Sequence, residues 1–190
     1  MSLLLSLSPC RIAPVPAFLP PSLALGAVLL LACLWDLRQR RIPNRLLGAG
    51  LAAAVVLQLG CGAPWALLTN CLAGFALGLA MFLPLYLAGG MAAGDVKLMA
   101  TVGAFIGPAL AFQSALATYC FGGLMALAIV LARGRARVAL ANVRALLRPL
   151  WWRLSGVRLA PEPPPASVGG MPYALAIAAG TLTVMVLHHT

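Results

Sequence analysis

The sequence predicts an all-α, polytopic membrane protein: a helix bundle of about six transmembrane helices with one basic interfacial helix. Of its 190 residues, 63% are hydrophobic and only 8% are charged. A soluble domain normally carries about 25% charged residues, so this chain has too little polar surface to coat a water-soluble globule. Its basic residues also fall in short clusters between long apolar runs, which is typical of loops between membrane spans.

Six stretches are candidates for membrane spans. A helix needs roughly 20 apolar residues to cross the hydrocarbon core. The candidates are residues 17–35, 46–62, 64–88, 98–111, 112–132 and 168–187. Gly107 and Pro108 mark the only plausible turn between the fourth and fifth spans. We expect residues 1–190 to form a single membrane-embedded domain.

The loops predict how the bundle is oriented. With six spans, residues 36–45, 89–97 and 133–158 fall on the same side of the membrane, and they hold 12 of the 13 lysines and arginines. Positive charge accumulates in cytoplasmic loops, so this side is predicted to be cytoplasmic, with both termini outside. The net charge of +10 therefore indicates contact with the anionic cytoplasmic leaflet of a lipid bilayer, and no nucleic-acid partner.

Residues 135–154 differ from the spans because arginines recur there at helical spacing, at Arg137, Arg144 and Arg148. This pattern predicts an interfacial helix whose arginines lie near lipid phosphates. Two interpretations stay open, a lipid-facing linker and a segment that guides a substrate. The Pro-rich residues 159–166 that follow predict an extended tether.

Two pairs of glycines have the spacing G-x-x-x-G, Gly74 with Gly78 and Gly103 with Gly107. Small residues at this spacing let helix backbones approach closely, so we interpret both pairs as packing sites within the bundle. The cysteines form no C-x-x-C pair, and we interpret them as small buried residues rather than zinc ligands or a disulfide framework. They are Cys10, Cys33, Cys61, Cys71 and Cys120.

Few side chains of this sequence can carry out chemistry. The acids are Asp36, Asp95 and Glu162, and the histidines are His188 and His189 at the C-terminal end. A serine peptidase needs a base beside its nucleophile, but the chain has no G-x-S-x-G and its histidines follow the last span. A zinc peptidase needs closely spaced ligands, and no H-E-x-x-H occurs. We interpret the histidines as a solvated tail and expect no metal and no other cofactor.

The two remaining aspartates are the candidate catalytic pair. Asp36 is expected at the cytoplasmic end of the first span and Asp95 just before the fourth, at the same face. A close carboxyl pair shares one proton, so one member can donate to a scissile carbonyl while the other takes a proton from water. The alternative is structural: Asp36 pairs with Arg38 or Arg40, and Asp95 neutralises Lys97 or caps a helix.

Three segments carry a resemblance to a known family. Residues 36–44 read D-L-R-Q-R-R-I-P-N, residues 94–98 read G-D-V-K-L, and residues 172–180 read P-Y-A-L-A-I-A-A-G. Together they resemble the type IV prepilin peptidase family, whose members carry an aspartate followed by basic residues and I-P-N, then G-x-G-D-x-K, then P-Y-G-x-A-I-A. The resemblance covers nearly the whole chain, with the segments in the same order.

The resemblance implies a membrane aspartic endopeptidase of the G-x-G-D type, in which Asp36 and Asp95 match the two catalytic aspartates. Such an enzyme removes the basic leader of a prepilin, its substrate partner, at the cytoplasmic face of the bacterial inner membrane. Cleavage follows a glycine just before the hydrophobic segment. The residues that match the family's motifs around the aspartates are Gly94, Lys97, Asn44, Pro43 and Tyr173.

The supporting residues have alternative roles. Lys97 either tunes the aspartate pair and orients its loop or extends to lipid phosphate. Asn44 either caps the second span or forms a hydrogen bond near Asp36. Pro43 is expected to shape the loop, and Tyr173 either lines the cleft or anchors the last span at the interface.

The sequence departs from the family in two ways. Ala92 and Ala174 stand where the family has glycines, and glycine permits backbone conformations that alanine does not. A second candidate function is therefore a catalytically impaired pilus assembly factor, and a third is a small ion-coupled transporter that uses the two aspartates. The short first loop, which has no cysteine, resembles the peptidase-only form of tight-adherence (Flp) pilus systems, so no methyltransferase activity is expected.

Overall fold

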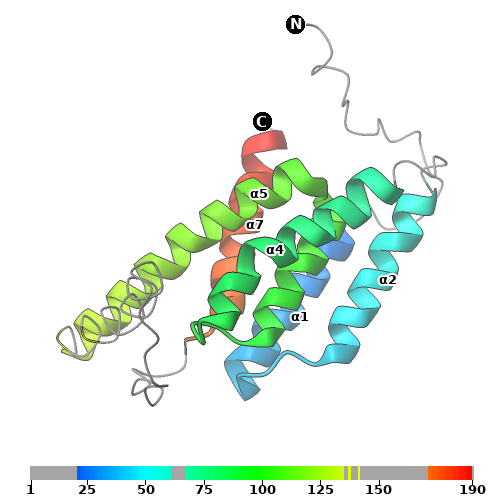
Figure 1. Cartoon of the computed structure of the whole chain (residues 1–190). Helices are drawn as coiled ribbons and strands as arrows, with labels where there is room; N and C mark the ends of the chain where they lie inside the picture. Colours follow the sequence, from blue (N-terminus) through cyan, green and yellow to red (C-terminus); the bar gives the residue numbers. More distant parts are fainter. Residues whose placement is uncertain (1–20, 61–66, 135–136, 138–140, 142–170, 190) are drawn as a thin grey trace, which may run out of the picture.

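A long apolar segment in lipid must satisfy its backbone hydrogen bonds internally, and a helix does so. The computed structural model describes residues 21–60, 67–134, 137, 141 and 171–189, and among these the regular structure is entirely helical. This confirms the predicted all-α membrane helix bundle. The helices are α1 (Pro21–Gln39), α2 (Asn44–Gly60), the π-helix η1 (Leu67–Leu72), α4 (Ala73–Leu87), α5 (Ala93–Ala132) and α7 (Tyr173–His189) (Figure 1).

Three helical stretches of the described residues are long and apolar enough to cross a membrane: Pro21–Gln39, Thr69–Leu87 and Ala93–Ala132. The stretches Asn44–Leu59 and Tyr173–His188 are shorter but also apolar. Large apolar side chains such as Leu30, Leu87 and Leu124 point outward from these helices. In a membrane this is the expected exposure, because the surface of the bundle faces acyl chains rather than water.

Helix α5 has 40 residues but is bent back on itself. Gly107 adopts φ 76° and ψ 172°, and Pro108 follows it, so the chain reverses there. We call residues 93–106 the inner arm of α5 and residues 108–132 its outer arm. Figure 1 shows the inner arm within the bundle and the outer arm leaning away from it. The predicted turn at Gly107 and Pro108 is confirmed, and the predicted boundary between residues 111 and 112 is wrong by four residues.

The sequence misplaced several other helix ends. Helix α1 continues beyond Asp36 to Gln39, where Arg40 takes the left-handed conformation (φ 52°) and donates its N–H to the Asp36 carbonyl oxygen at 2.9 Å. This is a common way of ending a helix. Helix α5 begins at Ala93, so Asp95 lies in its first turn rather than before it.

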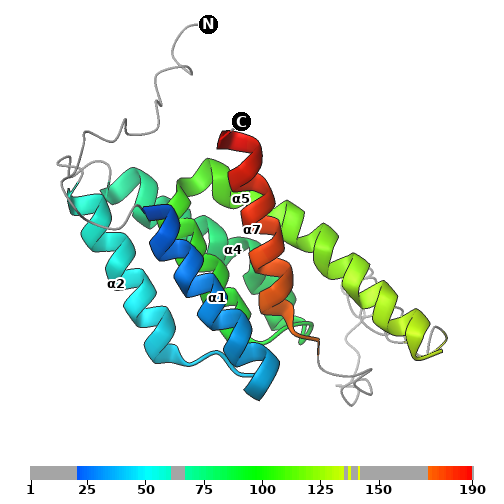
Figure 2. The same ribbon diagram turned by 180° about the vertical axis from the view of Figure 1, so that it is seen from behind.

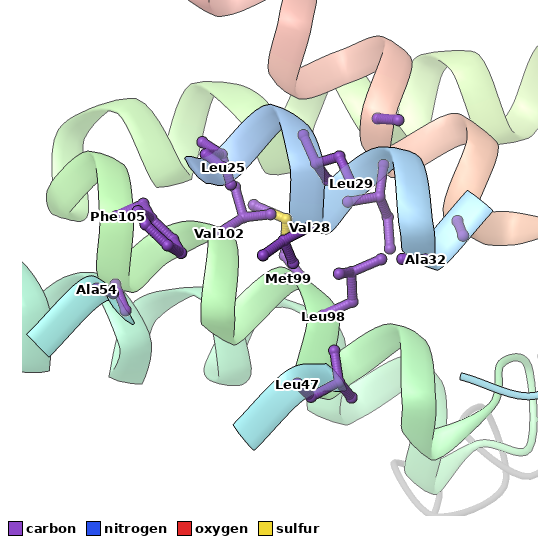
Figure 3. Packing of buried hydrophobic residues seen from close by; sticks show 14 of the residues in the cluster. Leu25, Val28, Leu29, Ala32, Leu47, Ala54, Leu98, Met99, Val102 and Phe105 are labelled. Atoms are coloured by element: carbon purple, nitrogen blue, oxygen red, sulfur yellow. The ribbon is translucent and has the colours of Figure 1, made fainter. Parts of the chain in front are cut away.

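The inner arm of α5 is the centre of the bundle. From residue 95 to residue 105 every side chain except that of Lys97 is buried. Leu98, Met99 and Val102 pack against α1 residues such as Leu29 in the hydrophobic core (Figure 3). This central helix carries Asp95 at the end that meets the C-terminal end of α1 and the N-terminal end of α7.

Helix α4 packs against the inner arm through the two G-x-x-x-G pairs. A Cβ atom built on Gly74 would overlap the backbone oxygen of Gly103, and one built on Gly103 would overlap the oxygen of Gly74. A Cβ on Gly78 would lie 2.5 Å from the oxygen of Met99. The predicted role in helix packing is confirmed for Gly74, Gly78 and Gly103, where the two backbones touch. Gly107 instead forms the turn of α5, and a Cβ atom built on it would meet the Asn70 side chain at 3.4 Å.

The cysteine prediction is only partly right. Cys33 and Cys71 are buried free thiols, as expected, whereas Cys120 is exposed on the outer arm of α5. An apolar residue in a membrane helix does not need to be buried, because lipid also solvates it. Cys10 and Cys61 lie outside the described residues.

Two further predictions fall mainly on residues that the structure does not describe. Of the predicted interfacial helix at 135–154, only Arg137 and Ala141 are described, and both are helical. The tether at 159–166 lies outside the described residues. The single domain over residues 1–190 also stays a prediction.

Candidate active site

The described residues enclose a cleft of about 850 Å³ at the end of the bundle where α1 ends and α5 and α7 begin. Its size is in the range of ligand-binding sites in proteins. Both aspartates line it, together with all the predicted supporting residues except Pro43. These residues are Asp36, Asn44, Gly94, Asp95, Lys97 and Tyr173.

Asp36 lies in the last turn of α1 and is only 7% exposed. Its Oδ2 atom accepts a hydrogen bond at 3.1 Å from the backbone N–H of Ala174, in the first turn of α7. The first backbone N–H groups of a helix have no partner within the helix, so this donor is available without disrupting α7. The Cys33 thiol donates to the Ala174 carbonyl oxygen at 3.4 Å. Helix α7 therefore fixes the orientation of the Asp36 carboxyl group.

Asp95 lies in the first turn of α5, and it is also only 7% exposed. Its backbone N–H donates to the Ala92 carbonyl oxygen at 3.1 Å. Asp95 and Asp36 line the same cleft. The structure therefore brings two buried acids that are 59 positions apart in the sequence into one site.

Lys97 does not serve as the counter-ion of Asp95. Its Nζ atom donates a hydrogen bond at 3.1 Å to Oδ1 of Asn44, at the start of α2. This contact favours the interpretation of Lys97 as a residue that holds the Asp95 end of α5 to a neighbouring loop. Pro43 does not line the cleft; its carbonyl oxygen accepts from the N–H groups of Leu46 and Leu47 and so begins α2.

A family model confirms the resemblance noted in the sequence. The model of the type IV leader peptidase family matches residues 23–127, more than half of the chain. The chain belongs to this family. The matched range includes both aspartates, whereas α7 lies outside it. No curated protein and no solved structure matches the chain.

Ala92 and Ala174 stand where the leader peptidase family has glycines, so their backbone conformations show whether either position requires a glycine. Ala92 has φ −81° and ψ 150°, an extended conformation that any residue adopts. Ala174 lies in the first turn of α7, is fully buried, and is not among the described residues with positive φ. Neither position therefore needs a glycine for conformational reasons. The leader peptidase fold accommodates both alanines as they stand.

Gly94 lies where two of the segments that resemble the leader peptidase family come into contact. A Cβ atom built on Gly94 would lie 3.4 Å from Cβ of Ile42, so the segment before Asp95 packs against the segment after Asp36. An alanine at position 94 would make ordinary van der Waals contact with Ile42.

Tyr173, the first residue of α7, lines the cleft. Its ring lies over Gly122, where a Cβ atom would approach the ring to 2.8 Å. Phe82 meets the Tyr173 ring edge-on at 6.2 Å and stacks on Tyr119 at 5.0 Å. The hydroxyl of Tyr119 donates to the carbonyl oxygen of Met81. Of the two interpretations of Tyr173, the structure favours the one that places it in the cleft.

Several cleft residues were not found from the sequence. They include Arg40 and Arg41 at the rim and Tyr119, Gly122 and Gly123 on the outer arm of α5. The adjacent glycines within an apolar run were the only signal for that wall. Glycine is frequent in membrane helices, so these two glycines alone did not indicate a cleft wall.

Proposed function

We propose that the chain is a membrane aspartic endopeptidase that removes the basic leader peptide from type IV, Flp-like prepilins. The single observation that carries the proposal is the pair of buried carboxyl groups in one cleft of a leader peptidase fold. Charged groups in membrane helices are costly, by roughly 2.5–3.5 kcal/mol on insertion scales, and are usually functional.

In the proposed mechanism, Asp36 and Asp95 share one proton, since two adjacent carboxylates do not easily ionise together. A water molecule between them loses a proton to the ionised carboxylate and attacks the scissile carbonyl carbon. The protonated carboxyl donates to the carbonyl oxygen, which gives a neutral tetrahedral intermediate. The intermediate then collapses, the C–N bond breaks, and a proton passes to the leaving amine. We assign no fixed acid or base within the pair.

The Ala174 N–H has a positioning role in this mechanism. It donates a hydrogen bond to Oδ2 of Asp36. The other oxygen of that carboxyl group is then left for the attacking water. Because the donor is a backbone group at the start of a helix, the orientation does not depend on a flexible side chain. Preorganised geometry of this kind lowers the cost of reaching the transition state.

We place the site at the cytoplasmic face of the bacterial inner membrane. Arg40, Arg41 and Lys97 line the cleft, and the positive-inside rule puts such basic residues on the cytoplasmic side. A prepilin with its apolar helix in the membrane and its basic leader in the cytoplasm would place its scissile bond at this depth. The connection between α1 and α2 spans only residues 40–43, which supports a peptidase without a methyltransferase insert.

The proposal is tested by co-expressing the chain with a pilin precursor from the same genome and scoring leader removal by gel shift and N-terminal sequencing. We expect wild type to cleave, and Asp36→Asn and Asp95→Asn each to lose activity by at least about 10³-fold, as for other groups that act as a catalytic unit. Glu162→Gln removes the only other acid and serves as the matched control.

Each result has a definite meaning. Cleavage that persists in either aspartate variant would overturn the mechanism. No cleavage by wild type that is inserted in the membrane would favour an assembly factor or a different pilin substrate, and restoring glycine at positions 92 and 174 would separate the two. Ion uptake into liposomes that depends on both aspartates would instead support a transporter.

A further inference from the structure

One wall of the cleft is a continuous face of the outer arm of α5. Tyr119, Gly122, Gly123 and Ala126 line the cleft, and they follow the spacing i, i+3, i+4, i+7 of one side of a helix. The residues of this wall carry no charge, whereas the charged lining residues all come from other segments of the chain: Asp36, Arg40, Arg41, Asp95 and Lys97.

Two neighbouring glycines on this face differ in what covers them. A Cβ atom on Gly122 would meet the ring of Tyr173 at 2.8 Å, whereas one on Gly123 would have no atom within 4 Å. Gly123 is exposed, although its neighbour Gly122 is buried. Among the described residues, no atom therefore covers Gly123, which lines the same cleft as the two aspartates.

The outer arm diverges from the bundle toward its C-terminal end, as Figure 1 and Figure 2 both show. On the opposite side of the same helical turns lie Phe121 and Leu124, which are 36% and 65% exposed. Large side chains thus face the lipid, while the side continuous with the cleft has a glycine and an alanine.

We infer that the face formed by Gly123 and Ala126 on the outer arm is the docking surface for the apolar helix of the membrane-anchored precursor. This inference rests on the proposed function. Small residues let two helix backbones approach closely, which is how helices associate in a bilayer, where burial from water gives no driving force. A helix seated there continues directly into the cleft, so the peptide just before it reaches Asp36 and Asp95.

Cross-linking tests the docking surface without requiring cleavage. The photoreactive residue p-benzoylphenylalanine is placed at Gly123 or at Leu124 in the Asp95→Asn background, with the precursor co-expressed in whole cells. We expect the precursor to be captured from position 123 and not from position 124, and the adduct to map to the apolar helix. Equal capture from both positions, or capture of phospholipid alone from position 123, overturns the inference.

A steric variant gives the functional readout. Gly123→Leu fills the proposed surface, and we expect it to lower precursor cleavage by at least about tenfold, as a loss of binding. Gly48→Leu is the matched control, since Gly48 is also an exposed helical glycine with no atom within 4 Å of a built Cβ. It should change cleavage by less than about twofold, as is usual for such surface sites.

The outcomes separate the inference from the proposed function. Cleavage by wild type that Gly123→Leu leaves unchanged overturns the docking surface and leaves the peptidase proposal intact. Capture from position 123 with no cleavage by wild type supports the docking surface and overturns the peptidase proposal. If position 123 captures no precursor and wild type does not cleave it, both the docking surface and the peptidase proposal are overturned.

Discussion

At the scale of single residues, the site depends on backbone groups as much as on the two carboxyl side chains. Ala174 contributes its N–H to Asp36, and the end of α1 is set by the left-handed conformation of Arg40. The Ala174 N–H is a backbone group that any residue except proline supplies. This explains why an alanine at position 174 is compatible with a complete site.

The two alanines give a prediction at this scale. Ala92→Gly and Ala174→Gly, alone or together, should change precursor cleavage by less than about threefold, because neither backbone conformation requires glycine. Each should lower stability by about 0.5–1 kcal/mol, since glycine loses more conformational freedom on folding. Cleavage assays and thermal unfolding in detergent would measure the two effects. A large gain in activity on restoring glycine would show that the alanines impair the enzyme.

At the scale of elements, the contact between α4 and the inner arm of α5 holds the centre of the bundle. Gly74, Gly78 and Gly103 allow the two helix backbones to touch. The spacing of these glycines was readable in the sequence, and so was the turn at Gly107 and Pro108. Their partners were not, because a G-x-x-x-G spacing does not say which helix packs on it.

The prediction for this contact is that Gly103→Ala destabilises the protein by about 3 kcal/mol, as in other overpacked cores. A Cβ atom there would overlap the backbone of α4, which cannot rotate out of the way as a side chain can. Gly26→Ala is the matched control within a helix, because nothing lies within 4 Å of a Cβ atom built there. Its stability should change by less than about 1 kcal/mol. Equal melting temperatures for the two variants would contradict the packing described here.

At the scale of the whole molecule, the aspartates and the basic rim lie at one end of the bundle and the end of α7 at the other. His188 of α7 and Gln113 of the outer arm form a hydrogen bond of 2.6 Å at that second end. Figure 1 shows the C-terminal end of the chain on the side opposite the start of the inner arm. A membrane around the bundle would therefore separate the two ends.

Thiol labelling would test which end faces the cytoplasm. In a chain whose native cysteines are replaced by serine, a membrane-impermeant reagent should label Arg41→Cys only in inverted vesicles. It should label His188→Cys only in intact spheroplasts, because the positive-inside rule puts the basic end in the cytoplasm. Labelling of both variants from one side would show that the two ends are not separated by the bilayer.

How much the sequence could predict also depends on scale. The membrane class, the helices and the meeting of Asp36 and Asp95 at one end follow from apolar run length and loop charge. The far wall of the cleft does not, because Tyr119, Gly122 and Gly123 face it only through the bend of α5 at Gly107. Helix ends were also missed, since α1 continues past Asp36 to Gln39 and Asp95 lies in the first turn of α5 rather than before it.

The contact of Gly74 with Gly103 also restricts how the sequence can vary. Usually a larger residue at one core position is offset by a smaller one at its partner, so that two positions vary together while their summed volume is kept. Here a side chain added at either glycine would collide with the main chain of the other helix. The partner is itself a glycine, so it has no side chain that could become smaller. No exchange between the two positions is available, and homologous chains that keep this helix crossing are expected to keep glycine at both.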